Sequence, residues 1–321
     1  MALVDQKTRS ITVQTLHILE KGQDPHQFDW QTGGYLSIEA YEGFNAWHGR
    51  LQRKQYRADW PYDGVQRDLS RFDDLVKLLQ PIPRDRIYPE FPADELTLFR
   101  PQQGADSEAL YLKAPKLGHY QDGSDDLAVR LLSEARVHER ILRNPHPNLD
   151  SYLGCVVEEG RLVRLALKRY GESVHDRSQS ATPRGFTFQQ RMGCMDQVEA
   201  AAAHLHSLGL AHNDISPSNI MFDNTGRAVL IDFDSCAPLG NTLTKGGLVS
   251  GWKGPIAGEG PQFHRSSATC DELAIQEIRR HLAEGSDLSV EEAAAANGSR
   301  CNRDVTAPED ITKRGTSSAE A

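Results

Sequence analysis

The chain has 321 residues, of which 38% are hydrophobic, 25% charged and 7% aromatic. This length suits one large domain or two smaller ones. The 45 acidic residues outnumber the 36 basic ones, and no block of five or six basic residues occurs. We therefore expect no nucleic acid among the partners of this protein.

The sequence also argues against a secreted or membrane protein. No apolar run reaches the roughly 20 residues that a membrane helix needs, and the N-terminal residues lack the apolar stretch of a secretory signal. The five cysteines are scattered, and none lies in a C-x-x-C pair. We expect an intracellular protein, cytoplasmic or nuclear, with reduced thiols and no membrane partner.

The first 90 residues contain one element that can be predicted. Between residues 67 and 80, apolar side chains recur at helical spacing, and two prolines end the pattern. The residues concerned are Leu69, Phe72, Val76, Leu79, Pro81 and Pro83. We expect a helix here, followed by a boundary or linker near residues 81–94, and the pattern assigns no role to residues 1–90.

The next segment predicts a small lobe of strands around one helix. Short runs rich in branched and aromatic residues indicate strands at residues 96–100, 109–113, 152–157 and 161–170. Between the second and third strands, residues 126–144 show helical spacing. The apolar face of this helix is expected to consist of Leu127, Leu131, Ala135, His138 and Leu142.

The rest of the chain is predicted to be helical up to about residue 283. A long helix is expected within residues 186–210, where Gly209 stands at the expected end. From residue 284 on there are few large apolar residues and no aromatic one, so we expect a disordered tail. The predicted regions are 1–90, a small lobe at 91–170, a helical lobe at 171–283 and the tail at 284–321.

The residues with chemical potential lie beyond the long helix. Residues 211–222 read A-H-N-D-I-S-P-S-N-I-M-F, and a strand that ends in I-D-F-D follows. Asn219 and Asp232 offer two oxygen ligands, which suit a hard cation such as Mg²⁺. Asp214 is then left to orient or deprotonate an attacking hydroxyl. This division of labour is what phosphoryl transfer requires.

These motifs resemble those of the protein kinase superfamily. His212-Asn213-Asp214 with Asn219 looks like its catalytic loop, and Asp232-Phe233-Asp234 looks like its metal-binding D-F-G. Upstream, Lys113 is similar to the strand lysine that holds nucleotide phosphates, and Glu134 resembles the helix glutamate that pairs with it. The segment 168–171 falls where the kinase hinge contacts adenine.

The resemblance covers about residues 95–282 and is most similar to a group of short kinase-like proteins of filamentous fungi, near the aminoglycoside-phosphotransferase branch. It implies an α+β, two-lobed protein-kinase-like fold with a small mixed N-lobe, a truncated helical C-lobe and a disordered C-terminal tail. It also implies ATP and Mg²⁺ as cofactors. The implied roles are Asp214 as the catalytic residue, Lys113 and Glu134 for the nucleotide, and Asn219 and Asp232 for the metal and the nucleotide. His212 is expected to support the loop rather than transfer protons.

Four positions depart from the family pattern. Gly104 is the one glycine between residues 96 and 113, where a glycine-rich loop should cover the phosphates. Asn213 replaces an arginine that answers activation-loop phosphorylation in many kinases, and Ser216 replaces a lysine. Asp234 replaces the glycine of D-F-G, where it could hold a second cation or lock the loop.

Three functions fit these motifs. The favoured one is an ATP- and Mg²⁺-dependent phosphotransferase that acts on a Ser or Thr hydroxyl of a protein. The second is a catalytically weak pseudokinase, a nucleotide-binding or scaffolding module, to which the missing glycine-rich loop points. The third is a small-molecule kinase of the aminoglycoside-phosphotransferase type, suggested by I-D-F-D and Ser216. The expected partners are a nucleotide and a protein or small-molecule hydroxyl acceptor.

Overall fold

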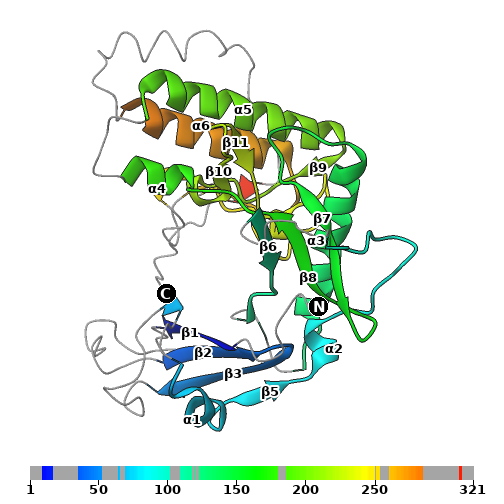
Figure 1. Cartoon of the computed structure of the whole chain (residues 1–321). Helices are drawn as coiled ribbons and strands as arrows, with labels where there is room; N and C mark the ends of the chain where they lie inside the picture. Colours follow the sequence, from blue (N-terminus) through cyan, green and yellow to red (C-terminus); the bar gives the residue numbers. More distant parts are fainter. Residues whose placement is uncertain are drawn as a thin grey trace, which may run out of the picture. The chain divides into compact units, whose positions relative to one another are not determined.

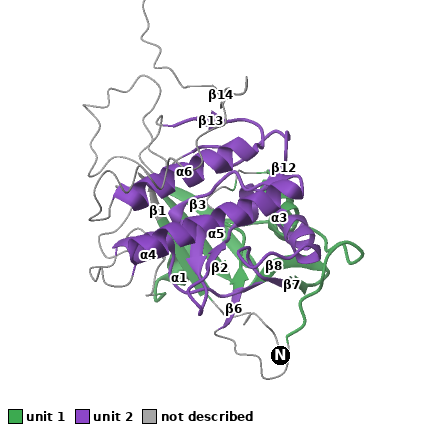
Figure 2. Cartoon of the chain, turned by 90° about the horizontal axis from the view of Figure 1, so that it is seen from above, with its two compact units in different colours: residues 1–105, 112–133, 154–166 green, residues 106–111, 134–153, 167–321 purple. Residues whose placement is uncertain are grey.

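The structure, a computed structural model, describes the part of the chain that the following ranges cover. They are residues 9–16, 35–52, 64–65, 69–101, 109–117, 120, 123–179, 186–249, 251–253, 260–284 and 311–312. The chain divides into two compact units, coloured in Figure 2. Unit 1 comprises residues 1–105, 112–133 and 154–166, and unit 2 comprises residues 106–111, 134–153 and 167–321.

Unit 1 begins with an antiparallel sheet in the N-terminal region (Figure 1). Its strands, in the order β4-β1-β2-β3-β5, are β1 (Arg9–Leu16), β2 (Tyr35–Glu42), β3 (Asn45–Gln52), β4 (Gly64–Val65) and β5 (Gln80–Ile82). The sequence carries a signal for this sheet, because Ile11 and Val13 alternate with polar residues, as Ile38 and Ala40 do. Their register, Ile11 opposite Ala40 and Val13 opposite Ile38, brings the buried side chains to one face.

The helix predicted before the prolines is much shorter than expected. Helix α1 spans Phe72–Val76, and its Phe72 and Leu75 are buried against the sheet. The chain then turns into β5, in which Pro81 pairs with Trp47 at the edge of the sheet, a position that tolerates proline. The segment 81–94 contains the end of β5, the short helix α2 (Arg84–Ile87) and the buried Tyr88.

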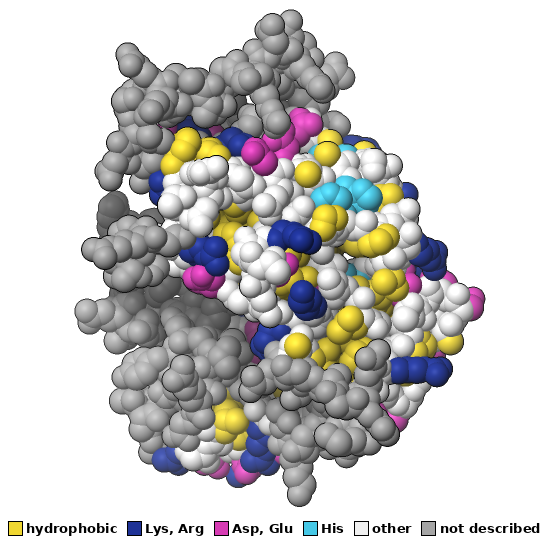
Figure 3. All heavy atoms as spheres, turned by 45° about the horizontal axis from the view of Figure 1, so that its top comes forward, with side chains coloured by type: hydrophobic (Ala, Val, Ile, Leu, Met, Phe, Trp, Pro, Cys, Tyr) yellow, Lys and Arg dark blue, Asp and Glu magenta, His cyan; other side chains and the backbone are white. Residues whose placement is uncertain are grey.

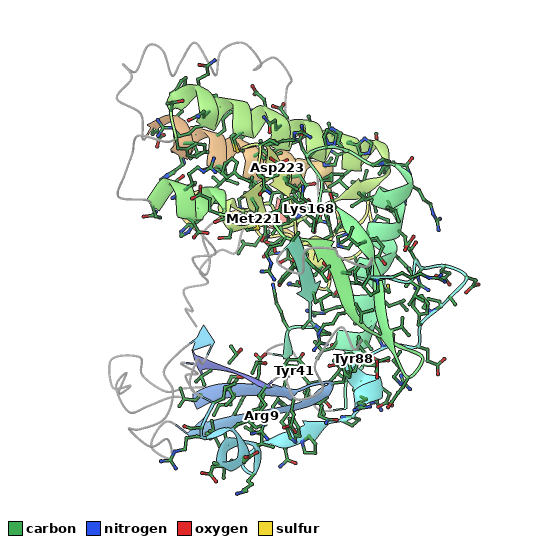
Figure 4. All side chains as sticks on the ribbon, in the orientation of Figure 1. Arg9, Tyr41, Tyr88, Lys168, Met221 and Asp223 are labelled. Atoms are coloured by element: carbon green, nitrogen blue, oxygen red, sulfur yellow. The ribbon has the colours of Figure 1, made fainter. Side chains whose placement is uncertain are left out.

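The N-terminal sheet packs against residues of the predicted small lobe within unit 1. The hydroxyl of Tyr41 donates a 2.6 Å hydrogen bond to the carbonyl of Pro115. Arg164, which is buried, lies with its guanidinium 5.5 Å from the ring of Tyr41, 5.7 Å from that of Phe44 and 5.9 Å from that of Tyr88. Tyr41 and Tyr88 are labelled in Figure 4. Tyr41, Phe44 and Tyr88 therefore belong to the same compact unit as Arg164.

The small lobe contains three of the four predicted strands and the predicted helix. They are β6 (Leu110–Lys113), α3 (Asp126–Arg143), β7 (Tyr152–Glu158) and β8 (Arg161–Lys168), and the strands form a sheet in the order β6-β8-β7. One residue of the predicted apolar face of α3 was wrong: Leu142 is 42% exposed, and Ile141 is buried in its place. The buried face shifts by one residue because an α-helix has 3.6 residues per turn, so positions spaced four apart gradually rotate away from the core.

The strand predicted at residues 96–100 is wrong. This segment forms a single parallel bridge, between Leu98 and Cys155. Phe99 donates to the Cys155 carbonyl at 2.8 Å, and Cys155 donates to the Thr97 carbonyl at 2.7 Å. The two segments can approach this closely because residue 154 is glycine. Gly154 has φ +127°, and a Cβ at this position would lie 2.7 Å from the Phe99 nitrogen.

Besides the second half of α3, the described helices of unit 2 are α4 (Val174–Gln179), α5 (Phe188–Ser207) and α6 (Ala268–Glu284). Between them lie short strands and 3-10 helices: β9 (Leu210–Ala211), η6 (Pro217–Asn219), β10 (Ile220–Phe222), β11 (Ala228–Leu230), η7 (Phe233–Ser235), β12 (Ala237–Pro238), η8 (Gly251–Lys253), β13 (Gln262–Phe263) and β14 (Ile311–Thr312). Helix α5 begins with a capping box between Thr187 and Gln190, and Gly209, with φ +70°, follows its end as predicted.

Helices α5 and α6 pack together over the core of unit 2. Met195 and Leu205 of α5 and Ile278 of α6 are buried in one cluster that also contains Phe233. The mixture of an antiparallel N-terminal part and a helical C-terminal part confirms the predicted α+β class. Of the predicted tail, Glu284 closes α6 and Ile311–Thr312 pair with Gln262–Phe263, and residues 285–310 and 313–321 lie outside the described residues.

The described cysteines lie in the interior of the protein. Four of the cysteines, Cys155, Cys194, Cys236 and Cys270, are buried, and none of them forms a disulfide among the described residues. Burial raises the pKa of the Cys194 thiol to about 12.

None of the described helices is both long and apolar enough to cross a membrane. On the face drawn in Figure 3, basic and acidic side chains stand among apolar ones.

Candidate active site

The loop that carries Asp214 follows β9, and a buried carboxylate accepts hydrogen bonds from its backbone. Asp271 of α6 has no exposed surface, and its two oxygens accept hydrogen bonds from the backbone amides of His212 and Asn213, both at 2.8 Å. His206 of α5 also contacts this carboxylate, at 2.9 Å. His206 therefore belongs to the support of the loop.

Asn213 is a structural centre of the loop. It is fully buried and adopts φ +61°, a left-handed conformation that asparagine tolerates better than most residues. Its side-chain amide donates to the carbonyls of Ala211 and Ser235 and to the hydroxyl of Ser266, and its oxygen accepts from the amide of Ser267. The residue that replaces the family's arginine therefore ties the loop to two other segments.

His212 makes backbone contacts through both ring nitrogens. Its Nδ1 accepts a hydrogen bond from the amide of Asp214 at 3.3 Å, so its Nε2 carries the proton and donates to the carbonyl of Ile231 at 2.9 Å. The ring is buried. These contacts fit the predicted supporting role, because neither nitrogen faces a reacting group.

Asp214 is a partly buried carboxylate among other charges. Burial is the largest influence on it and raises the pKa of its carboxyl group, and the nearby Asp234 and Asp232 raise this pKa further. The positive charge of Lys245 acts in the opposite direction. The net effect is a pKa above the usual value for aspartate, which suits a group that accepts a proton.

Of the two predicted metal ligands, Asn219 is hydrogen-bonded to Asp214 and to the residue that precedes Asp232. The Nδ2 of Asn219 donates to the carbonyl of Asp214 at 2.9 Å, and the carbonyl of Asn219 accepts from the amide of Ile231 at 2.9 Å. Ile231 directly precedes Asp232, which has the left-handed φ of +65°. Positive φ is uncommon in residues other than glycine, although aspartate adopts it more often than most.

The donor set fits Mg²⁺. With its Nδ2 directed at Asp214, the amide of Asn219 has its Oδ1 as the atom that could bind a metal, and Asp232 adds a carboxylate. Hard oxygen ligands from one or two residues, completed by phosphates and water, are typical of Mg²⁺ sites. The described residues contain no cluster of three His, Cys, Asp or Glu side chains that would form an all-protein metal site.

Asp234 forms an ion pair with Lys245, a residue that the sequence did not single out. Both side chains are largely buried, and Asp234 also accepts a hydrogen bond from the Ser235 hydroxyl at 3.3 Å. Of the two roles considered for Asp234, this contact favours locking of the loop. No local pattern could have found Lys245, because the contact depends on the path of the chain between the two residues.

A series of ring contacts, two edge-on and one stacked, connects the loop to α3 and β7. The ring centroid of Phe233 lies 5.3 Å from that of His212 and 5.2 Å from that of His138, which lies 5.1 Å from that of Tyr152. The His138 ring is fully buried, and neither of its nitrogens has a hydrogen-bond partner among the described residues. Its Nε2 lies 3.8 Å from Oε1 of Glu134.

The predicted nucleotide-binding residues lie in different units. Glu134 is buried in α3 within unit 2, close to the ring of His138. Lys113 is buried at the end of β6 within unit 1. The pairing of Lys113 with Glu134 stays a prediction. The single glycine expected near the phosphates, Gly104, lies outside the described residues.

Comparison with known proteins agrees with this geometry. Residues 104–252 match the family model of the protein kinase domain. The chain is 30% identical over 157 residues to the serine/threonine-protein kinase/endoribonuclease IRE1 of Hypocrea jecorina, which covers 42% of this chain and 12% of that protein. It is 26% identical over 179 residues to serine/threonine-protein kinase 1 of Arabidopsis thaliana, which covers 56% of this chain and 20% of that protein.

A third relative, serine/threonine-protein kinase ppk6 of Schizosaccharomyces pombe, is 36% identical over 69 residues, which are 22% of this chain and 8% of that protein. The chain thus spans a fifth or less of the length of these three relatives. The similarity includes the loop around Asp214 and the segment around Asp232, both of which lie within the matched residues. Residues 104–252 therefore resemble a protein kinase domain.

Proposed function

We propose that the protein is an ATP- and Mg²⁺-dependent phosphotransferase that transfers the γ-phosphoryl group to a Ser or Thr hydroxyl of a protein. The observation that carries this proposal is the hydrogen-bonded unit formed by Asp214, Asn219 and Ile231, since it joins the candidate base to one candidate metal ligand and to the residue before the other, Asp232. The relatives named above as serine/threonine-protein kinases support the choice of acceptor.

In the proposed reaction the acceptor oxygen attacks the γ-phosphorus of ATP. A new O–P bond forms as the bond to the bridging oxygen breaks, and the electron pair of that bond leaves with ADP. The proton of the hydroxyl passes to the carboxylate of Asp214, whose raised pKa favours its acceptance. Asp214 also orients the hydroxyl, and positioning of this kind accounts for much of phosphoryl-transfer catalysis.

The remaining site residues hold the nucleotide in this proposal. Lys113, oriented by Glu134, contacts the phosphates, and residues 168–171 contact the adenine. Asn219 and Asp232 hold Mg²⁺, which neutralises phosphate charge when it is bound. The Asn213 network and the Asp271 carboxylate keep the loop rigid, so that the base does not have to be ordered when the substrate binds.

The test uses the full chain with Mg-ATP and two kinds of acceptor. We expect transfer of labelled phosphate to a mixed Ser/Thr peptide library, and we expect Asp214→Asn to abolish it while the Mg-ATP-dependent rise in melting temperature persists. Asp232→Ala should abolish the dependence of that rise on Mg²⁺. Asp94→Asn, a change at an exposed aspartate, is the matched control.

Three outcomes separate this function from the alternatives. Undiminished turnover of Asp214→Asn would remove Asp214 from the mechanism. A melting shift with Mg-ATP but no transfer to peptides or small molecules would point to the pseudokinase. Transfer to an aminoglycoside but not to peptides would identify a small-molecule kinase.

A further inference from the structure

The loop around Asp214 lacks a positive charge where the chemistry needs one. Residues 211–222 contain no lysine or arginine, and Ser216 occupies the position where kinases that act on proteins usually carry lysine. The Ser216 side chain makes no capping hydrogen bond to η6. A phosphoryl group in transfer carries several negative oxygens, and cations fixed around it beforehand stabilise the transition state.

Lys245 brings a positive charge to the same place from a distant part of the chain. Its Nζ is ion-paired with Asp234, two residues beyond the candidate metal ligand Asp232. The Lys245 side chain is 22% exposed and that of Asp234 is 14% exposed, so solvent screens the charge only partly. The positive charge of Lys245 also acts on Asp214, where it offsets part of the rise in the pKa of the carboxyl group.

The backbone after Lys245 is attached to the catalytic loop. The amide of Gly247 donates a 2.7 Å hydrogen bond to the carbonyl of Asn213, the residue before Asp214. Gly246 and Gly247 have φ values of +75° and +79°, and a Cβ on Gly246 would lie 2.7 Å from the Asn213 carbonyl oxygen. Only glycine allows this approach without strain, so Gly246 and Gly247 let the backbone next to Lys245 lie against the catalytic loop.

We infer that the ammonium group of Lys245 takes the place of the missing loop lysine and binds the γ-phosphoryl group during its transfer. This inference rests on the proposed function and adds a catalytic residue to it. In the step, the acceptor O–P bond forms, the bond to the bridging oxygen breaks toward ADP, and the acceptor proton goes to Asp214. Lys245 keeps its protons throughout, and Asp234 holds its side chain in position.

The test measures single-turnover release of inorganic phosphate from Mg-ATP, with water as the acceptor, by the full chain. Lys245→Met should slow this step about 100-fold, the range seen when one fixed donor is removed from a transition state. Lys245→Arg, which keeps the charge, should stay within about tenfold of the wild type. The double variant Ser216→Lys with Lys245→Met should recover part of the rate, because it returns a cation to the usual position.

A matched control and a binding measurement complete the design. Lys77→Met removes another lysine that is ion-paired with an aspartate, Asp74 at 3.3 Å, but that is exposed and lies far along the chain, so it should leave the rate unchanged. The rise in melting temperature with Mg-ADP, which lacks the γ-phosphoryl group, should be the same for Lys245→Met as for the wild type. This equality would show that the variant is folded and binds nucleotide.

The inference is overturned if Lys245→Met releases phosphate within about threefold of the wild-type rate, or if Lys245→Arg loses as much as Lys245→Met. In both cases the wild type turns over, so the proposed function survives. If the wild type neither releases phosphate nor responds to nucleotide, the proposed function fails and the inference fails with it.

Discussion

The Nε2 of His206 lies 2.9 Å from Oδ2 of Asp271, a carboxylate without exposed surface. Because Asp271 also accepts the backbone amides of His212 and Asn213, one buried charge joins α5, α6 and the catalytic loop. A buried carboxylate of this kind is costly to remove, since each amide that loses its partner stays desolvated and unsatisfied.

Asp271→Ala should therefore lower the free energy of unfolding by about 3–5 kcal/mol. His206→Ala, which removes one partner of a carboxylate that keeps two others, should cost about 1 kcal/mol. Urea denaturation followed by far-UV circular dichroism measures both. Asp196→Ala is the control, because Asp196 is an exposed partner of Arg279 and its loss should cost less than about 1 kcal/mol. Equal effects of Asp271→Ala and Asp196→Ala would contradict the supporting role.

Asp214 should reduce the stability of the protein near neutral pH. Its pKa is raised in the folded state, chiefly by burial, so the folded protein binds this proton more tightly than the unfolded chain does. Below the ordinary aspartate pKa of 3.8 both states are protonated and the penalty is absent, whereas above the raised pKa the folded state carries the full penalty.

Asp214→Asn should consequently raise the free energy of unfolding at pH 7, by about 1 kcal/mol. The gain should shrink as the pH falls toward 4, where the wild-type side chain becomes neutral. Thermal melts of both proteins between pH 4 and 8 test this, with Asp94→Asn as the exposed control. A variant that is less stable at pH 7, or a gain that is independent of pH, would refute the assignment of a raised pKa.

Two buried histidines should respond to leucine with opposite signs. His138 has two ring nitrogens without a hydrogen-bond partner among the described residues, whereas both nitrogens of His212 are bonded to the backbone. His138→Leu should raise the free energy of unfolding by about 1 kcal/mol, because it removes unsatisfied polar atoms at similar volume. His212→Leu should lower it by about 2 kcal/mol. Chemical denaturation of both variants measures these changes. If both variants have a lower free energy of unfolding than the wild type, the ring contacts of His138 stabilise the protein by more than its two unbonded nitrogens destabilise it.

Local sequence patterns predicted the parts of the site that are local in the chain. The loop from His212 to Asn219 and the segment from Asp232 to Asp234 could be read because each keeps its residue types at short, fixed spacing. The ends of α5 could be read for a similar reason, since a cap and a glycine mark them. Where a strand depended on a distant partner the prediction failed, as at residues 96–100, whose one bridge needs the conformation of Gly154.

The contacts that sequence reasoning missed are all long-range. Lys245 meets Asp234 because two glycines of positive φ bring the segment back to Asn213, and no pattern around Lys245 encodes that return. The N-terminal sheet was missed for a different reason. Its alternating pattern at Ile11 and Val13 is present in the sequence, but it is short and stands among polar residues, so it was not recognised as strand.

The last prediction concerns Arg164, which connects the N-terminal sheet with β8 inside unit 1. Its guanidinium lies among the rings of Tyr41, Phe44 and Tyr88 and donates to the carbonyl of Val163 at 2.7 Å. Arg164→Met should lower the free energy of unfolding by about 2–4 kcal/mol, because it removes a desolvated cation–π contact and charged hydrogen bonds. Arg164→Lys should recover only part of this, since a lysine cannot stack as a planar guanidinium does.

Arg84→Met is the control for Arg164, because Arg84 is an exposed arginine paired with Glu159 at 2.9 Å and should cost less than about 1 kcal/mol. Limited proteolysis adds a local readout: Arg164→Met should speed cleavage within residues 9–52 relative to the wild type, because the sheet loses its attachment to β8. If Arg164→Met and Arg84→Met are equally stable and equally resistant, the N-terminal sheet does not depend on this contact, and residues 1–90 would have to be treated as an independently stable region.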